Sequence, residues 1–299
     1  MNLNAVNLKE YLASRIISID QALNLWVPAE TVEPETIHRA MRYSLFAGGK
    51  RIRPILCMAA ADVVRTDAAG VVNAAITLEM IHTYSLIHDD LPALDNDDFR
   101  RGQPTNHKIF GEAMAILAGD SLLTLAFQVL SNLPHSTSEI GLKLVAELSC
   151  ASGTVRGMIG GQVHDIEGEQ QQPTAALLEK IHRAKTGALL RASVRMGAIY
   201  ADANPLELQA LSEYGEHAGL AFQIVDDILD IEASSESLGK TAGKDLHQQK
   251  ITFPAVYGLA ESKRMAEEER QKAHAALAPF GARALRLIEV ADLIVDRKS

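Results

Sequence analysis

Long stretches of this chain repeat apolar residues at intervals of three and four, and this pattern limits the fold more than any other feature. The clearest examples span residues 72–91, 112–130, 138–158, 175–199 and 206–231, and all of them are too long for strands. Nothing alternates with a period of two for long enough to build a sheet. Segments such as 113–118 and 218–225 are apolar on nearly every side, as expected of helices at the centre of a bundle. The sequence therefore predicts an all-α fold, a single large helical bundle with a central cavity between its helices.

The composition narrows the class of protein. Of the 299 residues, 47% are hydrophobic, which is enough for a sizeable buried core. We find no low-complexity linker and no repeat of fixed period, so we expect a single domain over residues 1–299. The net charge of -9 argues against a nucleic-acid partner.

The chain also carries few signals for another compartment. No uninterrupted apolar stretch approaches the ~20 residues needed to cross a bilayer, which predicts no stable membrane insertion. Residues 1–20 lack a basic leader and an apolar signal core, so we expect a cytoplasmic protein. Cys57 and Cys150 have no metal-ligand spacing and lie in apolar helical contexts, so we expect reduced core thiols.

Two aspartate clusters lie far apart in the chain. The first contains Asp89, Asp90, Asp95, Asp97 and Asp98, with no basic residue among them. Such carboxylates repel one another by roughly 1 kcal/mol per pair in water and by about 4 kcal/mol in a half-buried, protein-like medium. Hard oxygen ligands of this kind suit Mg²⁺, which keeps several waters and bridges to substrate phosphates.

The geometry of the first cluster depends on Pro92. Proline cannot donate to the helix ladder and its ring clashes with the carbonyl four residues earlier, so the helix should end or bend there. Asp95 is then delivered by a turn, which lets it share a metal with Asp89. Arg100 and Arg101 follow at once, and adjacent guanidinium groups suit a bidentate grip on phosphate oxygens. The alternative is an acid-rich capped turn with neutralising arginines.

The second cluster contains Asp226, Asp227 and Asp230. On a helix these three residues fall within an arc of about 100°, so we expect them to point the same way. Gln223 lies one turn earlier on this face and could hydrogen-bond a ligand that the acids anchor. A solvated acidic face is the alternative, but the flanking residues are strongly apolar.

Basic and polar residues recur at further positions. Residues 48–54, with Gly49, Lys50 and Arg53, form a tight basic turn at an expected helix start, where an anion gains from free backbone amides. His82 lies two turns before Asp89 on the same helical face. A solvated turn and an ordinary helical histidine remain the alternatives.

Two other segments give weaker signals. Lys185 and Thr186 precede Gly187, and a Thr-Gly pair is a place where the helix ladder can loosen and free a carbonyl. Lys240 and Lys244 lie in the polar stretch 234–247, the likeliest mobile loop by composition, where they could fold over bound phosphates as a lid. Ordinary helix surface and a solvated loop are the alternatives.

In these motifs the chain closely resembles the short-chain trans-isoprenyl diphosphate synthases, specifically the bacterial farnesyl and plant-type geranylgeranyl diphosphate synthases. The resemblance covers nearly the whole length. It is carried by GGKRIRP at 48–54, EMIHTYSLIHDDLPALDNDDFRRGQPTNH at 79–107, AILAGDSLL at 115–123, GGQVHD at 160–165, KTGALLRAS at 185–193, GLAFQIVDDILD at 219–230 and GKTAGKD at 239–245.

The resemblance implies an isoprenoid synthase-like fold and a head-to-tail condensation. An allylic diphosphate ionises, isopentenyl diphosphate adds through its double bond, and a proton is lost. The cofactor implied is Mg²⁺, with about three ions per active site and Mn²⁺ able to substitute. The substrates are small molecules, isopentenyl diphosphate and allylic diphosphates, and a homodimer is expected.

The resemblance also implies roles for particular residues. Metal would be held by Asp89, Asp95 and Asp226, with Asp90 and Asp230 as further ligands and Asp227 in support. The allylic diphosphate would be held by Arg100, Lys185 and Lys240, and isopentenyl diphosphate by Gly49, Lys50, Arg53, His82 and Arg101. The allylic cation would be stabilised by the Lys185 carbonyl, the Thr186 hydroxyl and Gln223, and the departing diphosphate would take the proton. The basic residues Arg297 and Lys298 match a tail that caps the site.

Product length would be set by the side chains just before the first aspartate. Tyr84 stands five residues before Asp89, with Ser85 beside it, and an aromatic ring there would stop growth at about C15. The two extra residues in DDLPALD at 89–95 are likewise typical of bacterial farnesyl synthases. The surrounding sequence is equally close to plant-type C20 synthases, so the sequence favours C15 and keeps C20 as the alternative.

Three other functions compete with this interpretation. An HD-type metal phosphohydrolase is suggested by His82 and by the doublet His88-Asp89, but it needs histidine ligands where the second cluster offers carboxylates. A terpene cyclase would share the ionisation, but it normally carries Asn, Ser and Glu as its second metal set. A silent partner subunit is disfavoured because every charged motif is intact.

Overall fold

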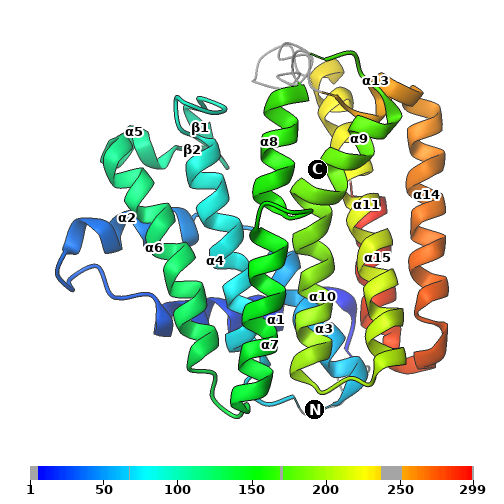
Figure 1. Cartoon of the computed structure of the whole chain (residues 1–299), viewed down its shortest axis with the longest axis horizontal. Coiled ribbons are helices and arrows are strands. Elements are labelled where there is room, and N and C mark those ends of the chain that lie inside the picture. Colours follow the sequence, from blue (N-terminus) through cyan, green and yellow to red (C-terminus); the bar gives the residue numbers. More distant parts are fainter. Residues whose placement is uncertain (1–5, 67, 169–170, 237–250, 298–299) are drawn as a thin grey trace.

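A computed structural model of the chain describes residues 6–66, 68–168, 171–236 and 251–297. Helices account for nearly all of its regular structure, and most of them run lengthwise beside one another (Figure 1). Within the described ranges the only strands are β1 (Phe99–Arg100) and β2 (Gln103–Pro104), a short antiparallel pair. The predicted all-α fold is confirmed.

In chain order, the described helices fall into three groups. Before the strand pair come α1 (Leu8–Trp26), α2 (Glu35–Leu45), α3 (Ile52–Val64) and α4 (Val71–Asp89). After it come α5 (Asn106–Phe110), α6 (Glu112–Ser131), α7 (Ser138–Ser152), α8 (Met158–Gly168), α9 (Ala175–His182), the π-helix η2 (Arg183–Gly187) and α10 (Ala188–Tyr200). The last group is α11 (Pro205–Glu236), α13 (Phe253–Tyr257), α14 (Leu259–Ala276), the 3₁₀-helix η3 (Ala278–Ala284) and α15 (Leu285–Asp296).

Four of the five predicted helices are confirmed, with small shifts of their ends. The helix predicted over 72–91 ends two residues early, at Asp89, because Pro92 stops it. The segment predicted over 138–158 is wrong as a single helix, since it divides into α7 and α8. A Cβ placed on Gly157 in the connection would lie 2.4 Å from the Cys150 carbonyl oxygen, so only glycine allows this close return of the chain.

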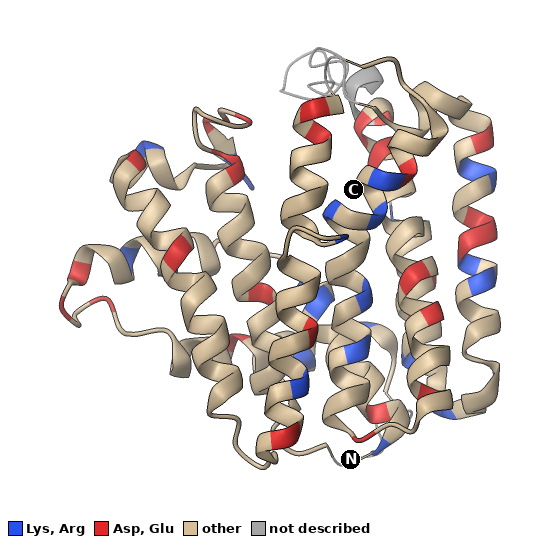
Figure 2. Ribbon diagram, viewed as in Figure 1, with Lys and Arg blue, Asp and Glu red and all other residues tan. Residues whose placement is uncertain are grey.

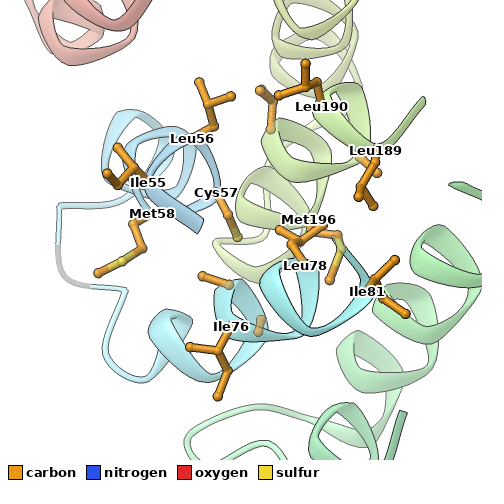
Figure 3. Close-up of a cluster of buried hydrophobic side chains, with 14 of the residues drawn as sticks. Ile55, Leu56, Cys57, Met58, Ile76, Leu78, Ile81, Leu189, Leu190 and Met196 are labelled. Atoms are coloured by element: carbon orange, nitrogen blue, oxygen red, sulfur yellow. The ribbon is translucent and has the colours of Figure 1, made fainter. Parts of the chain in front are cut away.

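The core is centred on α4, which is buried on nearly all sides and packs against α3, α6 and α10. Figure 3 shows Leu78 of α4 next to Cys57 of α3 and Met196 of α10, while Ile76 and Ile81 lie on other sides of the helix. The backbones of α3 and α10 approach so closely that a Cβ on Gly197 would lie only 1.9 Å from the Cys57 carbonyl oxygen. This tight packing fixes the positions of the two helices that flank α4.

A second apolar cluster supports the carboxyl-terminal half of α11. It contains Ile224, Val225 and Ile228 of α11 and reaches α9, α13 and α14 through Ile181, Phe253 and Ala266. The second aspartate cluster lies among these residues in the sequence. Its helix is therefore held by packing on the faces that do not carry the carboxylates.

One expectation about apolar segments is wrong, that for Cys150, and one apolar helix has the length of a membrane span. The helix α6 is long and apolar enough to cross a membrane by length and composition, with a mean hydropathy of 1.7 over its most apolar window. It nevertheless packs against α4 in the bundle, as the apolar core helix of a folded protein does. Cys57 is a buried thiol as expected, whereas Cys150 is exposed and is no core thiol.

Candidate active site

The first aspartate cluster lies at the end of α4. The chain turns back immediately, and the Asp95 amide donates to the Asp89 carbonyl oxygen at 2.8 Å while the Asp97 amide donates to the Asp90 carbonyl oxygen at 3.2 Å. This turn brings Asp95 beside Asp89, as the break at Pro92 predicts. Burial raises the pKa of Asp89 to about 6, with Asp95 and Asp90 adding to the rise and Lys185 and Arg100 opposing it. The ionised form of Asp89 beside Asp95 is therefore unfavourable until a cation binds.

Asp90 has a different environment from Asp89. It is buried, and Arg100 grips it through Nε at 2.8 Å from Oδ1 and through Nη2 at 2.6 Å from the same oxygen. The Arg100 side chain is 33% exposed, so one edge of its guanidinium still faces outward. Asp90 therefore fixes the orientation of the Arg100 guanidinium, and its role as a metal ligand stays a prediction.

The second cluster divides between two environments, although its three residues were expected to point the same way. Asp227 is buried, and it accepts from the Gln223 amide at 2.9 Å and from the Phe253 backbone amide at 2.8 Å. Asp226 instead accepts from Arg297 Nη2 at 2.5 Å. Burial raises the pKa of Asp226, while Arg297, Arg53 and Lys50 oppose the rise. Asp226 and Asp230 are half-buried and remain the carboxylates of this cluster suited to a metal.

The two clusters lie at the same end of the bundle. Figure 2 shows acidic residues at the upper ends of α4 and α11, with basic residues of the π-helix between them. Lys185 of the π-helix acts on the pKa of Asp89, and Arg53 acts on that of Asp226. We call the side chains of Asp89, Asp90 and Asp95 and those of Asp226 and Asp230 the two acidic walls. Cationic groups act on both walls, as expected where a polyanion and metal ions bind together.

The acidic walls fit Mg²⁺ held in part by its substrate. Among the described residues, no three His, Cys, Asp or Glu side chains come close enough to enclose a metal on their own. Mg²⁺ does not need such a cage, because it usually takes one or two carboxylates together with waters and substrate phosphate oxygens. The raised pKa values of Asp89 and Asp226 show that both walls would gain from a bound cation.

The basic turn before α3 places its residues in two opposite directions. Arg51 has a left-handed backbone with φ of 51° and is buried in an ion pair with Glu79 at 2.7 Å, so it is structural. Arg53 is turned into the site, and its buried Nε has no hydrogen-bond partner in the described part of the chain. Burial and the nearby Arg53, Arg101 and Arg100 hold the pKa of His82 well below its usual range. A neutral histidine therefore lies within a group of guanidinium ions, of which Arg100 is paired with Asp90.

Arg101 completes this basic group from the other side. Its guanidinium donates to the Gly48 carbonyl oxygen, and a Cβ on Gly49 would lie 3.0 Å from Arg101 Nη1. Both glycines have positive φ, of 87° and 145°. Glycine at 49 thus keeps the turn open for Arg101, in agreement with the predicted anion site.

A cavity of about 260 Å³ joins the predicted residues. It is lined by seven of them, namely Arg53, His82, Tyr84, Ser85, Asp89, Lys185 and Thr186. Its remaining wall is largely apolar and includes Met158, Ile159 and Val163 of α8. Charged and apolar side chains thus line one cavity, which can hold both a charged group and a hydrocarbon chain.

The chain-length residues lie against this cavity. Tyr84 is 5% exposed and its ring packs edge-on against His88, with ring centroids 5.7 Å apart. Ser85 donates its hydroxyl to the His82 carbonyl oxygen at 2.9 Å. His88 itself bonds the Ile116 carbonyl oxygen at 3.0 Å and fits over Gly119, where a Cβ would lie 2.2 Å from its ring. His88 is thus engaged with α6, which disfavours the phosphohydrolase that would need it as a metal ligand.

The π-helix η2 confirms the loosened ladder that was expected at the Thr-Gly pair. Helix α8 approaches the π-helix so closely that a Cβ on Gly161 would lie 2.1 Å from the Lys185 amide nitrogen. Lys185 Nζ donates to Asp165 Oδ2 at 2.6 Å. Asp165 is a site residue that the sequence analysis missed, although it ends the GGQVHD motif at 160–165.

Some predicted residues are elsewhere or are not described. Gln223 bonds Asp227 and lies outside the lining of the 260 Å³ cavity. Arg297 reaches the site as the tail was expected to, contacting Asp226 and the Phe222 carbonyl oxygen at 2.8 Å. Lys240, Lys244 and Lys298, with the proposed lid, lie outside the described residues.

Comparisons with known proteins agree with this geometry. A model of the polyprenyl synthetase family matches residues 34–279. The chain is 47% identical to a dimethylallyltranstransferase of Fischerella ambigua (strain UTEX 1903) over 97% of its own length and 84% of the relative's. It is also 47% identical to a chloroplastic geranylgeranyl pyrophosphate synthase of Capsicum annuum over 97% of its own length and 79% of that protein's.

Solved structures resemble it over nearly its whole length. An FPP/GFPP synthase from Zymomonas mobilis superposes with a TM-score of 0.87 at 36% identity, covering 97% of this chain and 99% of the other. A geranyltransferase from Legionella pneumophila superposes with a TM-score of 0.86 at 34% identity, covering 97% of each. The chain therefore belongs to the polyprenyl synthetase family, the trans-isoprenyl diphosphate synthases.

Proposed function

We propose that this prenyltransferase condenses isopentenyl diphosphate with dimethylallyl and geranyl diphosphates and releases the C15 product, farnesyl diphosphate. The observation that carries the proposal is the 260 Å³ cavity that joins Arg53, Asp89 and Lys185 at its charged part and meets Tyr84. A diphosphate with a hydrocarbon tail needs both kinds of wall in one cavity.

The acidic walls would hold the metal. Asp89, Asp90 and Asp95 on one wall and Asp226 and Asp230 on the other are the proposed ligands of Mg²⁺. Bound there, Mg²⁺ would stabilise the negative charge that develops on the departing diphosphate. Lys185, which lines the 260 Å³ cavity, and Arg100 would hold the diphosphate in place, with Asp165 and Asp90 orienting them.

The basic group formed by Lys50, Arg53, His82 and Arg101 would bind isopentenyl diphosphate. Arg53 Nε has no hydrogen-bond partner among the described residues, and burial together with the nearby arginines lowers the pKa of His82. Both observations support the binding of an anion by this group. The two diphosphates would then lie on either side of the cavity, with their carbon atoms between.

The reaction would proceed by ionisation, condensation and elimination. The C1–O bond of the allylic diphosphate breaks and its electron pair leaves with diphosphate. The resulting cation would be stabilised by the Lys185 carbonyl and the Thr186 hydroxyl, with Gln223 contributing from outside the lining of the cavity. The double bond of isopentenyl diphosphate supplies the electrons of the new C–C bond. The proton then passes to the departing diphosphate, so no nucleophile of the protein is required.

Tyr84 supports C15 as the product length. Its side chain is nearly fully buried, lines the cavity and is braced by His88, so it would obstruct a longer chain. The alternative is a C20 product, since relatives at 47% identity are named geranylgeranyl pyrophosphate synthases. The Zymomonas mobilis protein is named an FPP/GFPP synthase, so products differ among similar proteins.

We also infer a cytoplasmic homodimer in which residues 1–299 form one domain. The support for a dimer is the apolar surface of α6, where Ile116 and Leu117 are 44% and 52% exposed. A second copy of the chain can cover the same surface on both subunits around a twofold axis.

The test is product analysis. Purified protein receives Mg²⁺, isopentenyl diphosphate and each allylic primer in turn, and the dephosphorylated alcohols are separated by chromatography. We expect C15 alcohol, and we expect Asp89→Ala and Asp226→Ala to lower turnover by roughly 10³-fold or more while the helical fold persists. A main C20 product would overturn the C15 assignment alone, and near-normal turnover in either variant would overturn the metal role.

A further inference from the structure

The ring of Tyr84 is held by packing and not by a hydrogen bond. Its hydroxyl is buried and has no hydrogen-bond partner in the described part of the chain. The side chain is 5% exposed and lines the 260 Å³ cavity. A ring without a hydrogen bond stays in one rotamer only while the side chains around it are fixed. The position of Tyr84 therefore depends on its neighbours.

His88 is the aromatic neighbour of Tyr84. It follows Tyr84 by one turn of α4, so the two side chains lie on the same side of that helix. Their rings meet edge-on at an interplanar angle of 76°, with centroids 5.7 Å apart, and edge-on pairs are favourable beyond the area that they bury. Both residues line the cavity. A movement of the His88 ring would therefore remove a contact that holds Tyr84.

The His88 ring is itself fixed by α6, the helix that packs against α4. Its Nε2 lies 3.0 Å from the Ile116 carbonyl oxygen. A carbonyl oxygen can only accept, so Nε2 carries the hydrogen of this bond. The bond ties the ring to the backbone of a packed helix, and this sets the orientation of the ring.

Gly119 makes room for this ring on α6. A Cβ at this position would lie 2.2 Å from His88 Nε2, 2.6 Å from Cδ2 and 2.9 Å from Cε1. These distances are too short for atoms that are not bonded, so a residue with a side chain would displace the ring. Gly119 is buried within α6, where glycine is unfavourable relative to alanine. The close contact with His88 explains why glycine is needed in the middle of this helix.

We propose that Gly119 and His88 are specificity-determining residues: Gly119 seats the His88 ring, and His88 holds Tyr84 where it stops the growing chain. The inference rests on the proposed function and extends it from Tyr84 to the residues that support Tyr84. His88 is a positioning residue, because it acts through Tyr84. When this support is lost, the Tyr84 ring can turn into another rotamer, and a longer hydrocarbon chain can pass it.

The test is the distribution of chain lengths, measured by chromatography of the dephosphorylated alcohols. We define the length ratio as the amount of product one C5 unit longer than the main wild-type product, divided by the amount of that main product. In His88→Ala we expect this ratio to rise roughly tenfold. His88→Gln keeps a donor near the Nε2 position and fills part of the seat, so its ratio should return toward that of the wild type. A purely structural role would lower the amount of active enzyme without changing the ratio.

Combined variants test the route from Gly119 to Tyr84. Gly119→Ala keeps His88 but closes its seat, so the length ratio should rise in this variant as well. In a His88→Ala background the added methyl group has no ring to displace, so Gly119→Ala should change nothing further. In a Tyr84→Ala background His88→Ala should also change nothing further, since the ring that it positions is already missing.

Gly168→Ala is the matched control for the added methyl group. A Cβ on Gly168 would meet only side-chain atoms, at 3.4 Å or more, so the length ratio should equal that of the wild type. If Gly119→Ala does not fold, the His88 variants decide. Wild-type ratios in the folded His88→Ala and Gly119→Ala variants overturn the inference, and so does further lengthening when His88→Ala is added to Tyr84→Ala. A wild-type protein that forms no prenyl diphosphate overturns the proposed function instead, and a main C20 product overturns only the C15 assignment.

Discussion

Asp89 shows at the scale of one residue how the fold prepares a metal site. It is held beside Asp95 and Asp90 with part of its surface removed from water, and this raises its pKa to about 6. The ordinary value is 3.8, so the folded metal-free protein binds this proton more tightly than the unfolded chain does. Protonated Asp89 contributes its full share to the free energy of unfolding below 3.8, the pKa of the unfolded chain. This contribution is lost as the pH rises through about 6, the pKa in the folded protein.

Asp89→Asn should therefore stabilise the metal-free protein more at pH 7.5 than at pH 5. The amide cannot ionise, so it avoids a cost of at most about 3 kcal/mol, at about 1.4 kcal/mol for each unit of pKa. Thermal unfolding in EDTA measures the difference between variant and wild type at each pH. With Mg²⁺ and inorganic diphosphate present, the wild type should instead unfold at the higher temperature, because the metal requires the carboxylate. An equal difference at both pH values in EDTA contradicts this account of Asp89.

We propose that Tyr84, which lines the cavity, limits the length of the product. Tyr84→Ala removes the ring that lies against the cavity, so we expect the product to lengthen by at least one C5 unit. Chromatography of the dephosphorylated alcohols measures the shift.

Tyr84→Phe is the matched control, because the buried Tyr84 hydroxyl has no hydrogen-bond partner among the residues described. This variant keeps the ring, so its product distribution should stay that of the wild type. If Tyr84→Ala leaves the distribution unchanged, another side chain limits the product.

The sequence predicted which residue types form the site better than it predicted where each side chain points. Arg51 and Arg53 are two residues apart in one basic turn, yet Arg51 pairs with Glu79 and Arg53 enters the site. The left-handed backbone at Arg51 decides this, and no local pattern reveals it. Asp165 was missed for a related reason, since its partner Lys185 comes from another helix.

At the scale of elements, local chemistry predicted the breaks that glycine and proline impose within one helix. Pro92 ends α4, and the Thr186-Gly187 pair marks the π-helix. The division between α7 and α8 was not predicted, because it depends on a close return of the chain, in which a Cβ on Gly157 would lie 2.4 Å from the Cys150 carbonyl oxygen. Such a contact depends on the course of the chain and leaves no periodic signal in the sequence.

The end of α15 brings a cation to the second aspartate cluster. Arg297 donates to Asp226 and packs over the Phe222 ring, with its guanidinium carbon 4.0 Å from the ring centroid. In the absence of metal, this arginine supplies the positive charge that the carboxylate needs. A metal ion at Asp226 must then compete with Arg297.

Arg297→Gln should therefore tighten the binding of Mn²⁺ to the substrate-free protein, by roughly fivefold, the factor for an ion pair of about 1 kcal/mol. Titration calorimetry measures the affinity directly. Arg283→Gln is the control, because Arg283 bonds the Val63 carbonyl oxygen and lies over Phe280. A weaker affinity in Arg297→Gln, or an equal gain in the control, contradicts the competition.

At the scale of the whole molecule, α10 sets the separation of the two acidic walls. It packs against α3 and α4 on one side and against α11 on the other. The close approach at Gly197 fixes one of these contacts, and the approach of Gly219 to Gly187 fixes the α11 contact at the π-helix. The walls come from distant parts of the sequence, but each is tied to the same central helix. The sequence could predict each wall, whereas their distance depends on this packing.

The apolar surface of α6 leads to a prediction about assembly. A stable dimer usually buries about 1,600 Å² in total, and its central apolar side chains carry much of the binding free energy. Leu117 is a candidate for such a position, since this apolar side chain on the apolar helix α6 is 52% exposed. Leu117→Lys would place a charge in the interface, so we expect it to convert a dimer into monomers at micromolar concentration. Size-exclusion chromatography with light scattering measures the mass.

Leu25→Lys is the matched control, because Leu25 on α1 is 84% exposed and the same substitution there adds the same charge. The control should keep the mass of the wild type, and both variants should keep its helical circular dichroism. If the wild type has the mass of a single 32.4 kDa chain, the dimer proposal is wrong. If the wild type is a dimer and Leu117→Lys stays one, the second copy binds elsewhere, and the exposed residues of α6 need another explanation. Because α6 also packs on α4, which carries Asp89 and Tyr84, loss of the dimer should lower turnover as well as mass.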